Sequence, residues 1–134
     1  MIPAEYLHSI RERLVDDGFV TSFRILRERA TEVDAHIREV IELFDDSRPE
    51  FSEYVQIAAG NVIEVTTYSY HLTDAHSNLI YRWDNAPHHP GMSGFPHHYH
   101  ARFLPQDQVQ TSEPMCIFRV LDDLLIWLES DPSM

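Results

Sequence analysis

The sequence contains no lysine, and all ten of its basic residues are arginines. Schiff-base chemistry and the Walker A phosphate loop both require a lysine amine, so both are excluded. Cys116 is the only cysteine, which rules out an internal disulfide and fits a reducing compartment. No apolar run reaches about 18 residues, and the first residues lack the basic head and apolar stretch of a secretory signal. We therefore expect a cytoplasmic protein with no membrane-spanning segment.

Negative charge is what the chain has in excess. It carries 22 acidic against 10 basic residues, a formal net charge of −12 at pH 7. Charge of this sign repels nucleic acid at long range, so any activity on RNA would need a local basic patch or a basic partner. The length of 134 residues and the 43% hydrophobic content predict a single domain, residues 1–134, with one core.

Hydrophobic periodicity predicts a helix, then a run of strands, then a second helix. Apolar residues at helical spacing predict a helix over 3–17, and two-residue alternation predicts the strands. The predicted strands begin at Phe19 and continue over 35–43, 51–57, 62–72 and 79–83, with 97–103 as a further short candidate. Asp74–Asn78 is a polar turn between two of them, which makes that pair the clearest hairpin.

The second helix has the strongest pattern. Ser112 is a good N-cap, with Glu113 and Pro114 in the first turn, and Asp131–Pro132 ends the helix. Its apolar stripe consists of Ile117, Val120, Leu121, Leu124, Leu125 and Leu128. The order of elements predicts an α+β fold: one domain with an antiparallel sheet of about five strands and an N-terminal and a C-terminal helix packed on one face.

The segment from Tyr68 to His100 is the predicted functional centre, within a hairpin and histidine-rich loop spanning 62–103. Five of the nine histidines fall in thirteen residues of this segment: His88, His89, His97, His98 and His100. Strand alternation places His98 and His100 on one face and His97 on the other. Likewise, Arg82 and Asp84 share a face, opposite Trp83. His71 lies on the neighbouring strand of the hairpin.

Three interpretations of this segment remain open. In the first, histidines transfer protons during metal-free RNA cleavage, with Arg82 on the phosphate and Asp84 orienting a histidine. Tyr68, Tyr70 or Trp83 would stack a base, and Asn85 would hold the loop. In the second, zinc or a similar divalent ion is bound by Asp84 with some of His88, His89, His98 and His100. In the third, the histidines are structural and satisfy turns and buried carbonyls.

Three motifs carry a family resemblance: YSYH at 68–71, RWDNAPHH at 82–89 and FPHHYH at 95–100. This pattern resembles the TumE-type toxin family of prokaryotic toxin–antitoxin systems. The resemblance implies a small toxin, expected to be a ribonuclease, that pairs with a helix-turn-helix antitoxin. Our leading hypothesis requires no redox cofactor, and a divalent metal such as zinc remains the alternative. The positions that it carries over are Tyr68, Tyr70, His71, Arg82, Trp83, Asp84, Asn85, His88, His89, His97, His98 and His100.

Other functions remain compatible with the same motifs. The alternative is a non-enzymatic binding module, or a subunit of a defence or regulatory complex, whose histidine-rich loop is structural or holds a metal. Either kind of protein is compatible with a homo-oligomer. A cysteine without a basic neighbour is expected to pack rather than react, so Cys116 is not a candidate nucleophile.

Overall fold

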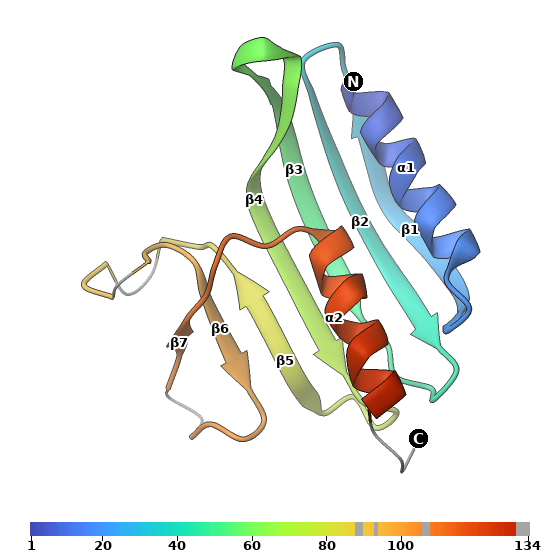
Figure 1. Ribbon diagram of the computed structural model, residues 1–134, viewed down its shortest axis with the longest axis vertical. Helices are drawn as coiled ribbons and strands as arrows, with labels where there is room; N and C mark the ends of the chain where they lie inside the picture. The colour runs from blue at the N-terminus through green and yellow to red at the C-terminus, as the bar shows by residue number, and fades with distance from the viewer. Residues whose placement is uncertain (88–89, 93, 106–107, 131–134) are drawn as a thin grey trace.

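Seven strands of one antiparallel sheet follow one another in chain order in the computed structural model, which describes residues 1–87, 90–92, 94–105 and 108–130 (Figure 1). Each strand pairs with the next, so the sheet is a simple meander. The strands are β1 (Val20–Ala30), β2 (Asp34–Leu43), β3 (Glu50–Ala58), β4 (Val62–Thr73), β5 (Leu79–Asp84), β6 (His98–Ala101) and β7 (Gln110–Thr111), with a short 3₁₀ turn, η1 (Ala59–Asn61), between β3 and β4.

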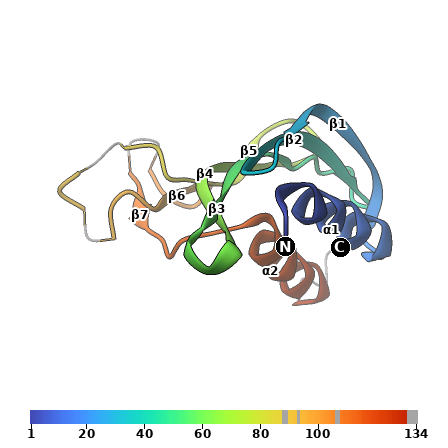
Figure 2. The same ribbon diagram turned by 90° about the horizontal axis from the view of Figure 1, so that it is seen from above.

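Both helices lie against the same face of the sheet, as Figure 2 shows. Helix α1 spans Pro3–Asp16 and helix α2 spans Ile117–Ser130. The helices also touch each other: the rings of Tyr6 and Phe118 meet edge to face, 5.9 Å between centroids. We call the helix-covered side of the sheet the covered face and the opposite side the open face.

Alternation along the strands builds the core on the covered face. In β2 every second residue is buried, and Ala35, Ile37 and Ile41 are fully inaccessible. On α2, Ile117, Val120, Leu121 and Leu124 are buried against this surface. The predicted stripe is therefore confirmed over these turns, whereas Leu125 is 38% exposed.

The α+β class and the helix over the first residues are confirmed, but two details of the prediction are wrong. The sheet has seven strands rather than about five. The unpredicted β7 has only two residues, too few to show any periodicity. Helix α2 begins at Ile117 rather than after Ser112, whose hydroxyl instead donates a hydrogen bond to the Glu113 carbonyl.

A buried carboxylate explains where α2 begins. Glu53 of β3 is completely inaccessible and accepts three hydrogen bonds on the covered face. The donors are the Tyr6 hydroxyl of α1 at 2.5 Å, the Tyr70 hydroxyl of β4 at 2.5 Å and the Ile117 N–H of α2 at 2.6 Å. A carboxylate at a helix N-terminus satisfies an orphan N–H and complements the helix dipole. Glu53 therefore fixes both helices to the sheet.

A second buried carboxylate lacks such partners. Glu39 of β2 is also inaccessible, and neither of its oxygens has a hydrogen-bond partner among the residues that the structure describes. Burial raises the pKa of Glu39 from 4.5 to about 7, and the nearby Arg11 opposes that shift. A substantial part of Glu39 is therefore neutral at physiological pH.

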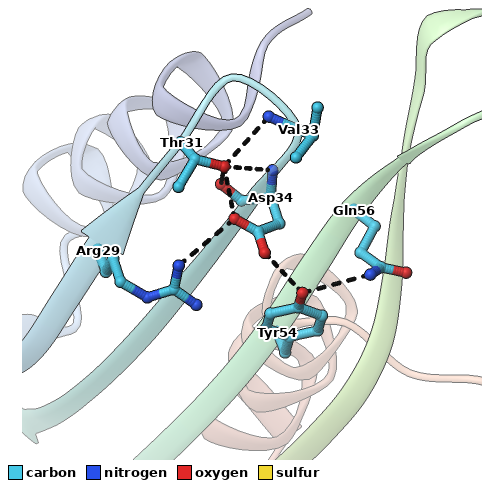
Figure 3. Close-up of polar contacts among 6 residues, drawn as sticks. All are labelled: Arg29, Thr31, Val33, Asp34, Tyr54 and Gln56. Atoms are coloured by element: carbon cyan, nitrogen blue, oxygen red, sulfur yellow. Dashed lines mark hydrogen bonds and ion pairs between the residues drawn. The ribbon is translucent and has the colours of Figure 1, made fainter.

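The turn between β1 and β2 is held by a polar network (Figure 3). The Tyr54 hydroxyl donates to Asp34 at 2.6 Å, and the Thr31 hydroxyl donates to the same carboxylate at 2.6 Å. These bonds lower the pKa of Asp34, and Arg29 lies 3.5 Å from it. The network orders the end of β1 and keeps Arg29 beside β2.

Among the helices of the described ranges, none is long and apolar enough to cross a membrane.

Candidate functional site

The register of the sheet aligns the predicted polar residues of the hairpin on the open face. Residues paired across antiparallel strands project to the same side of a sheet, with Cβ atoms roughly 4.5–5.5 Å apart. His71 of β4 pairs with Arg82 of β5, and Arg82 pairs with His100 of β6. One cross-strand row thus places a guanidinium between two imidazoles.

A second row lies beside the first. Ser69 pairs with Asp84, and Asp84 pairs with His98. The Asp84 Oδ1 atom lies 3.0 Å from His98 Nε2 and accepts the Ala86 N–H at 3.1 Å. The other ring nitrogen of His98, Nδ1, donates to the Pro96 carbonyl at 2.9 Å. Asp84 and Pro96 therefore hold the buried His98 ring by both of its nitrogens.

Arg82 keeps much of its bonding capacity for an external partner. Its Nε atom lies 3.6 Å from Asp84 Oδ2, an ion-pair distance that is too long for a hydrogen bond. The same Nε atom is buried and has no hydrogen-bond partner within the described part of the chain. The side chain is 42% exposed, so its guanidinium is reachable from solvent.

Two hollows of the surface meet at Arg82. A groove of about 220 Å³ is lined by residues of β2 to β5: Arg38, Glu50, Phe51, Ser52, Ser69, His71 and Arg82. A larger hollow of about 560 Å³ lies on the β6 side and includes Arg82, His100 and Arg102. A ligand lying across the sheet would pass over the His71–Arg82–His100 row.

Burial and positive charge lower the pKa of His71. Burial is the larger cause and the adjacent Arg82 the second, while Glu50 opposes them. His71 is therefore neutral near pH 7 and can accept a proton. This combination of a neutral imidazole and an accessible guanidinium is suited to deprotonating a hydroxyl next to a bound anion.

The predicted aromatic residues lie on the other side of the sheet. Tyr68, Tyr70 and Trp83 are 3%, 2% and 9% exposed on the covered face. His97 is with them: its Nδ1 atom lies 2.8 Å from the Tyr68 hydroxyl. Burial raises the pKa of Tyr68 to about 12 and lowers that of His97. These four rings do not meet the open-face row, so the structure divides the predicted site residues between two faces.

Asn85 continues the sheet beyond the end of β5. Its Oδ1 atom accepts the Tyr68 N–H at 2.9 Å, and its Nδ2 atom donates to the Thr66 carbonyl at 2.9 Å. Its amide thus takes the place of a backbone partner for β4, which fixes the start of the loop. His88 and His89, also predicted, lie outside the described residues.

Arginines of the first strands extend the open face, and the sequence analysis missed their role. By register, Arg24, Arg27 and Arg29 of β1 and Arg38 of β2 share the side of Arg82. Burial is the largest cause that lowers the pKa of His36. The charges of Arg27, Arg29 and Arg38 lower it further, so these three arginines lie around the His36 ring. The arginines at every second or third position of β1 were the available signal.

The comparison with known families agrees with the motifs. A family model described as Toxin TumE matches residues 9–131. The match covers nearly the whole chain, so the chain belongs to the TumE toxin family, as the motif resemblance predicted. Membership indicates a toxin of a toxin–antitoxin system, with an antitoxin as its general kind of partner. No curated protein and no solved structure shows a significant match.

Proposed function

We propose that this toxin is a ribonuclease that cleaves RNA on the open face, where Arg82 binds the phosphate between His71 and His100. The observation that carries the proposal is the cross-strand row of these three side chains. RNA cleavage through the 2′-hydroxyl needs a proton acceptor, a proton donor and a cation for the phosphate. The row supplies one candidate for each role within neighbouring strands.

The proton balance assigns the two imidazoles to opposite ends of the reaction. His71, which is neutral near pH 7, takes the proton of the 2′-hydroxyl as that oxygen attacks phosphorus. The bond from phosphorus to the 5′-oxygen breaks, and His100 delivers a proton to that leaving oxygen. Arg82 balances the charge on the phosphate throughout. Asp84 and His98, in the row beside it, act as positioning residues. The products are a 2′,3′-cyclic phosphate and a 5′-hydroxyl.

The charge distribution supports RNA as the substrate despite the net charge of −12. Five of the ten arginines lie on the open face: Arg24, Arg27, Arg29, Arg38 and Arg82. Arg29 forms an ion pair with Asp34, and Arg38 forms one with Glu50. Arg24 and Arg27 have no ion pair in the described structure. Asp34, Glu42, Glu50 and Asp84 lie on the same face, so this face is close to neutral within a strongly acidic molecule. Arg24 and Arg27 supply its local cationic edge, which a polyanion can approach. The base-stacking role predicted for Tyr68, Tyr70 and Trp83 is not included, because these rings are buried.

The test is incubation of purified protein with RNA, with and without EDTA, followed by analysis of the RNA ends. We expect cleavage that resists EDTA and leaves 2′,3′-cyclic phosphate and 5′-hydroxyl ends. Intact RNA in both reactions, with a folded protein, would contradict the ribonuclease. Cleavage abolished by EDTA, with 3′-hydroxyl ends, would replace proton transfer by the two histidines with metal-assisted hydrolysis.

The antitoxin completes the proposal. We expect a helix-turn-helix protein encoded beside this chain to bind it in the cytoplasm and to suppress its activity. Co-expression of the two proteins, followed by purification of a complex that no longer cleaves RNA, tests this expectation. Toxicity that the neighbouring protein does not relieve would contradict it.

A further inference from the structure

We propose that Asp84, His98 and His100 form a binding site for a divalent transition ion such as Zn²⁺. One ligand atom from each residue lies within 4.8 Å of the other two. Two imidazoles and a carboxylate are a common donor set for such ions. Zinc–ligand bonds of about 2.0–2.1 Å would require these atoms to approach to about 3.3 Å, which side-chain rotation can achieve. The Asp84–His98 pair, at 3.0 Å, is already that close.

The hydrogen bonds of His98 provide the main argument. A carbonyl only accepts, so His98 Nδ1 must carry the hydrogen that it shares with Pro96. In the neutral ring, Nε2 then presents a lone pair to the Asp84 carboxylate at 3.0 Å. Two acceptors this close repel each other unless a cation lies between them. Either a second proton on His98 or a metal ion meets this requirement.

The third side chain favours the metal ion. A proton shared by His98 and Asp84 needs no third group, whereas a metal ion binds additional ligands. His100 projects from the same strand face two residues later, with its ring centroid 5.5 Å from that of His98. The outer hydrogen bonds also match those of metal ligands: Pro96 orients His98, and the Ala86 N–H orients Asp84.

The position of Arg82 determines which oxygen of Asp84 can bind the ion, and the ligand types determine which ion suits the site. Arg82 lies 3.6 Å from Asp84 Oδ2 and occupies the side of the carboxylate away from His98. It leaves Oδ1 as the ligand atom, since Oδ1 is the atom that faces His98. A single carboxylate with two neutral imidazoles suits zinc rather than calcium or magnesium, which prefer several oxygen ligands.

The ion would also regulate the proposed cleavage, and this consequence rests on the proposed function. Ligation uses the lone pair of His100 that proton transfer requires, so zinc and proton transfer compete for one side chain. We therefore expect saturating zinc to slow cleavage at least about ten-fold. Ion binding is measured without RNA, so a failure of the metal site and a failure of the ribonuclease are distinguishable.

The direct test is calorimetric titration of chelator-treated full-length protein with Zn²⁺, together with Co²⁺ absorption to report tetrahedral coordination. We expect one ion per chain. Asp84→Asn and His100→Ala should each weaken affinity at least about ten-fold. These two residues are less buried than His98, so their variants are better suited to retain the fold. His36→Ala is the matched control, because His36 lies on the same face outside the cluster and contacts Ser52 at 3.1 Å.

The outcomes separate clearly. Binding that is lost in Asp84→Asn and His100→Ala but kept in His36→Ala supports the site. No ion bound to the folded wild-type protein overturns it. Unchanged affinity in both cluster variants also overturns it, because the ion then binds elsewhere. If one variant fails to fold, as circular dichroism would report, the other alone decides.

Discussion

The two faces of the sheet carry similar polar residues but bond them in different ways. On the covered face, Glu53 has three internal donors, from α1, β4 and α2. On the open face, the one ion pair of the Arg82 side chain with the described residues spans 3.6 Å, and Arg82 lines two hollows of the surface. Groups whose bonding capacity is used inside the molecule support its structure, whereas groups that keep capacity towards solvent are available for chemistry.

The same contrast separates residues of one motif. Tyr68 and Tyr70 alternate with Ser69 and His71 along β4, so the YSYH motif serves both faces. The tyrosines bond to His97 and Glu53 beneath the helices. His71 lines the open groove beside Arg82. A single contiguous motif is therefore half core and half candidate site.

Removing the buried carboxylate of Glu53 on the covered face should have the largest effect on stability. Glu53→Ala leaves the Tyr6 hydroxyl and the first N–H of α2 without their described acceptor, and leaves the Tyr70 hydroxyl with the distant Met115 carbonyl at 3.5 Å. Each loss costs about 1–3 kcal/mol. Relief of the buried charge offsets part of that sum. We expect a loss of about 4 kcal/mol in the free energy of unfolding, measured by urea denaturation.

The control for this change lies on the same strand. Glu50→Ala removes an open-face carboxylate whose only described ion pair is with Arg38, at 3.0 Å. An exposed pair of this kind is worth less than about 1 kcal/mol. Equal destabilisation by the two variants would remove the distinction between the faces.

Removing the open-face cation should affect activity rather than stability. For Arg82→Ala we expect RNA cleavage to fall about 100- to 1,000-fold, or about 3 to 4 kcal/mol in transition-state stabilisation, at nearly unchanged unfolding free energy. Arg82→Lys should restore only part of it, because lysine cannot bind phosphate in bidentate fashion. Arg119→Ala is the control, since Arg119 lies on α2 and pairs with Glu113. Full cleavage by Arg82→Ala would contradict the assigned row.

The unsatisfied carboxylate of the covered face should make stability depend on pH. The pKa of Glu39 is raised from 4.5 to about 7 in the folded protein, so the unfolded chain releases its proton first. The contribution of Glu39 to stability is therefore full below about pH 4.5 and declines as the pH rises through 7, by as much as about 3 kcal/mol. Glu39→Leu should remove this decline and stabilise the protein at pH 8 by a similar amount.

Unfolding curves at pH 5 and pH 8 measure this effect. Glu42→Leu is the matched control, because Glu42 lies on the same strand but is exposed on the open face. We expect its stability difference between the two pH values to equal that of the wild type. His36, His71 and His97 have lowered pKa values and shift stability in the opposite direction, but they do so equally in the wild type and in Glu39→Leu. A pH dependence of Glu39→Leu equal to that of the wild type would therefore contradict the role of Glu39.

Local patterns predicted the faces of the strands but not the partners across them. Alternation correctly separated Arg82 and Asp84 from Trp83, since the side of a residue follows from its position in its own strand. Arg82 lies between His71 and His100 because β5 pairs with β6 in a particular register. The length of the loop between β5 and β6 does not predict that register. The sequence therefore indicated the members of the row but not their order.

Long-range partners also explain the misplaced helix start. Ser112, Glu113 and Pro114 are favourable residues for the start of a helix, so local sequence alone predicts that the helix begins there. In the structure the acceptor for the first N–H of α2 is Glu53, 64 residues away. Glu39 and Glu53 both interrupt apolar alternation, which was the only available sign of a buried carboxylate. Nothing local distinguishes the satisfied acid from the unsatisfied one.

The smallest expected effect concerns the arginines at the far edge of the open face. Arg24 and Arg27 of β1 lie in line with the rows that contain Arg82 and Asp84 of β5, with three strands between them. If RNA follows the open face, each contributes one phosphate contact. Replacing both with alanine should weaken RNA binding several-fold and reduce the salt dependence by about one unit of slope per contact.

Binding at several salt concentrations distinguishes these contacts from a general effect of charge. The control is Arg11→Ala combined with Arg119→Ala, which makes the net charge more negative by the same amount on the two helices of the covered face. A general effect would change the slope equally in both double variants. A slope that changes only for Arg24 and Arg27 means that the polyanion lies on the open face. It would also show that a chain with a net charge of −12 binds RNA through the placement of a few arginines rather than through its overall charge.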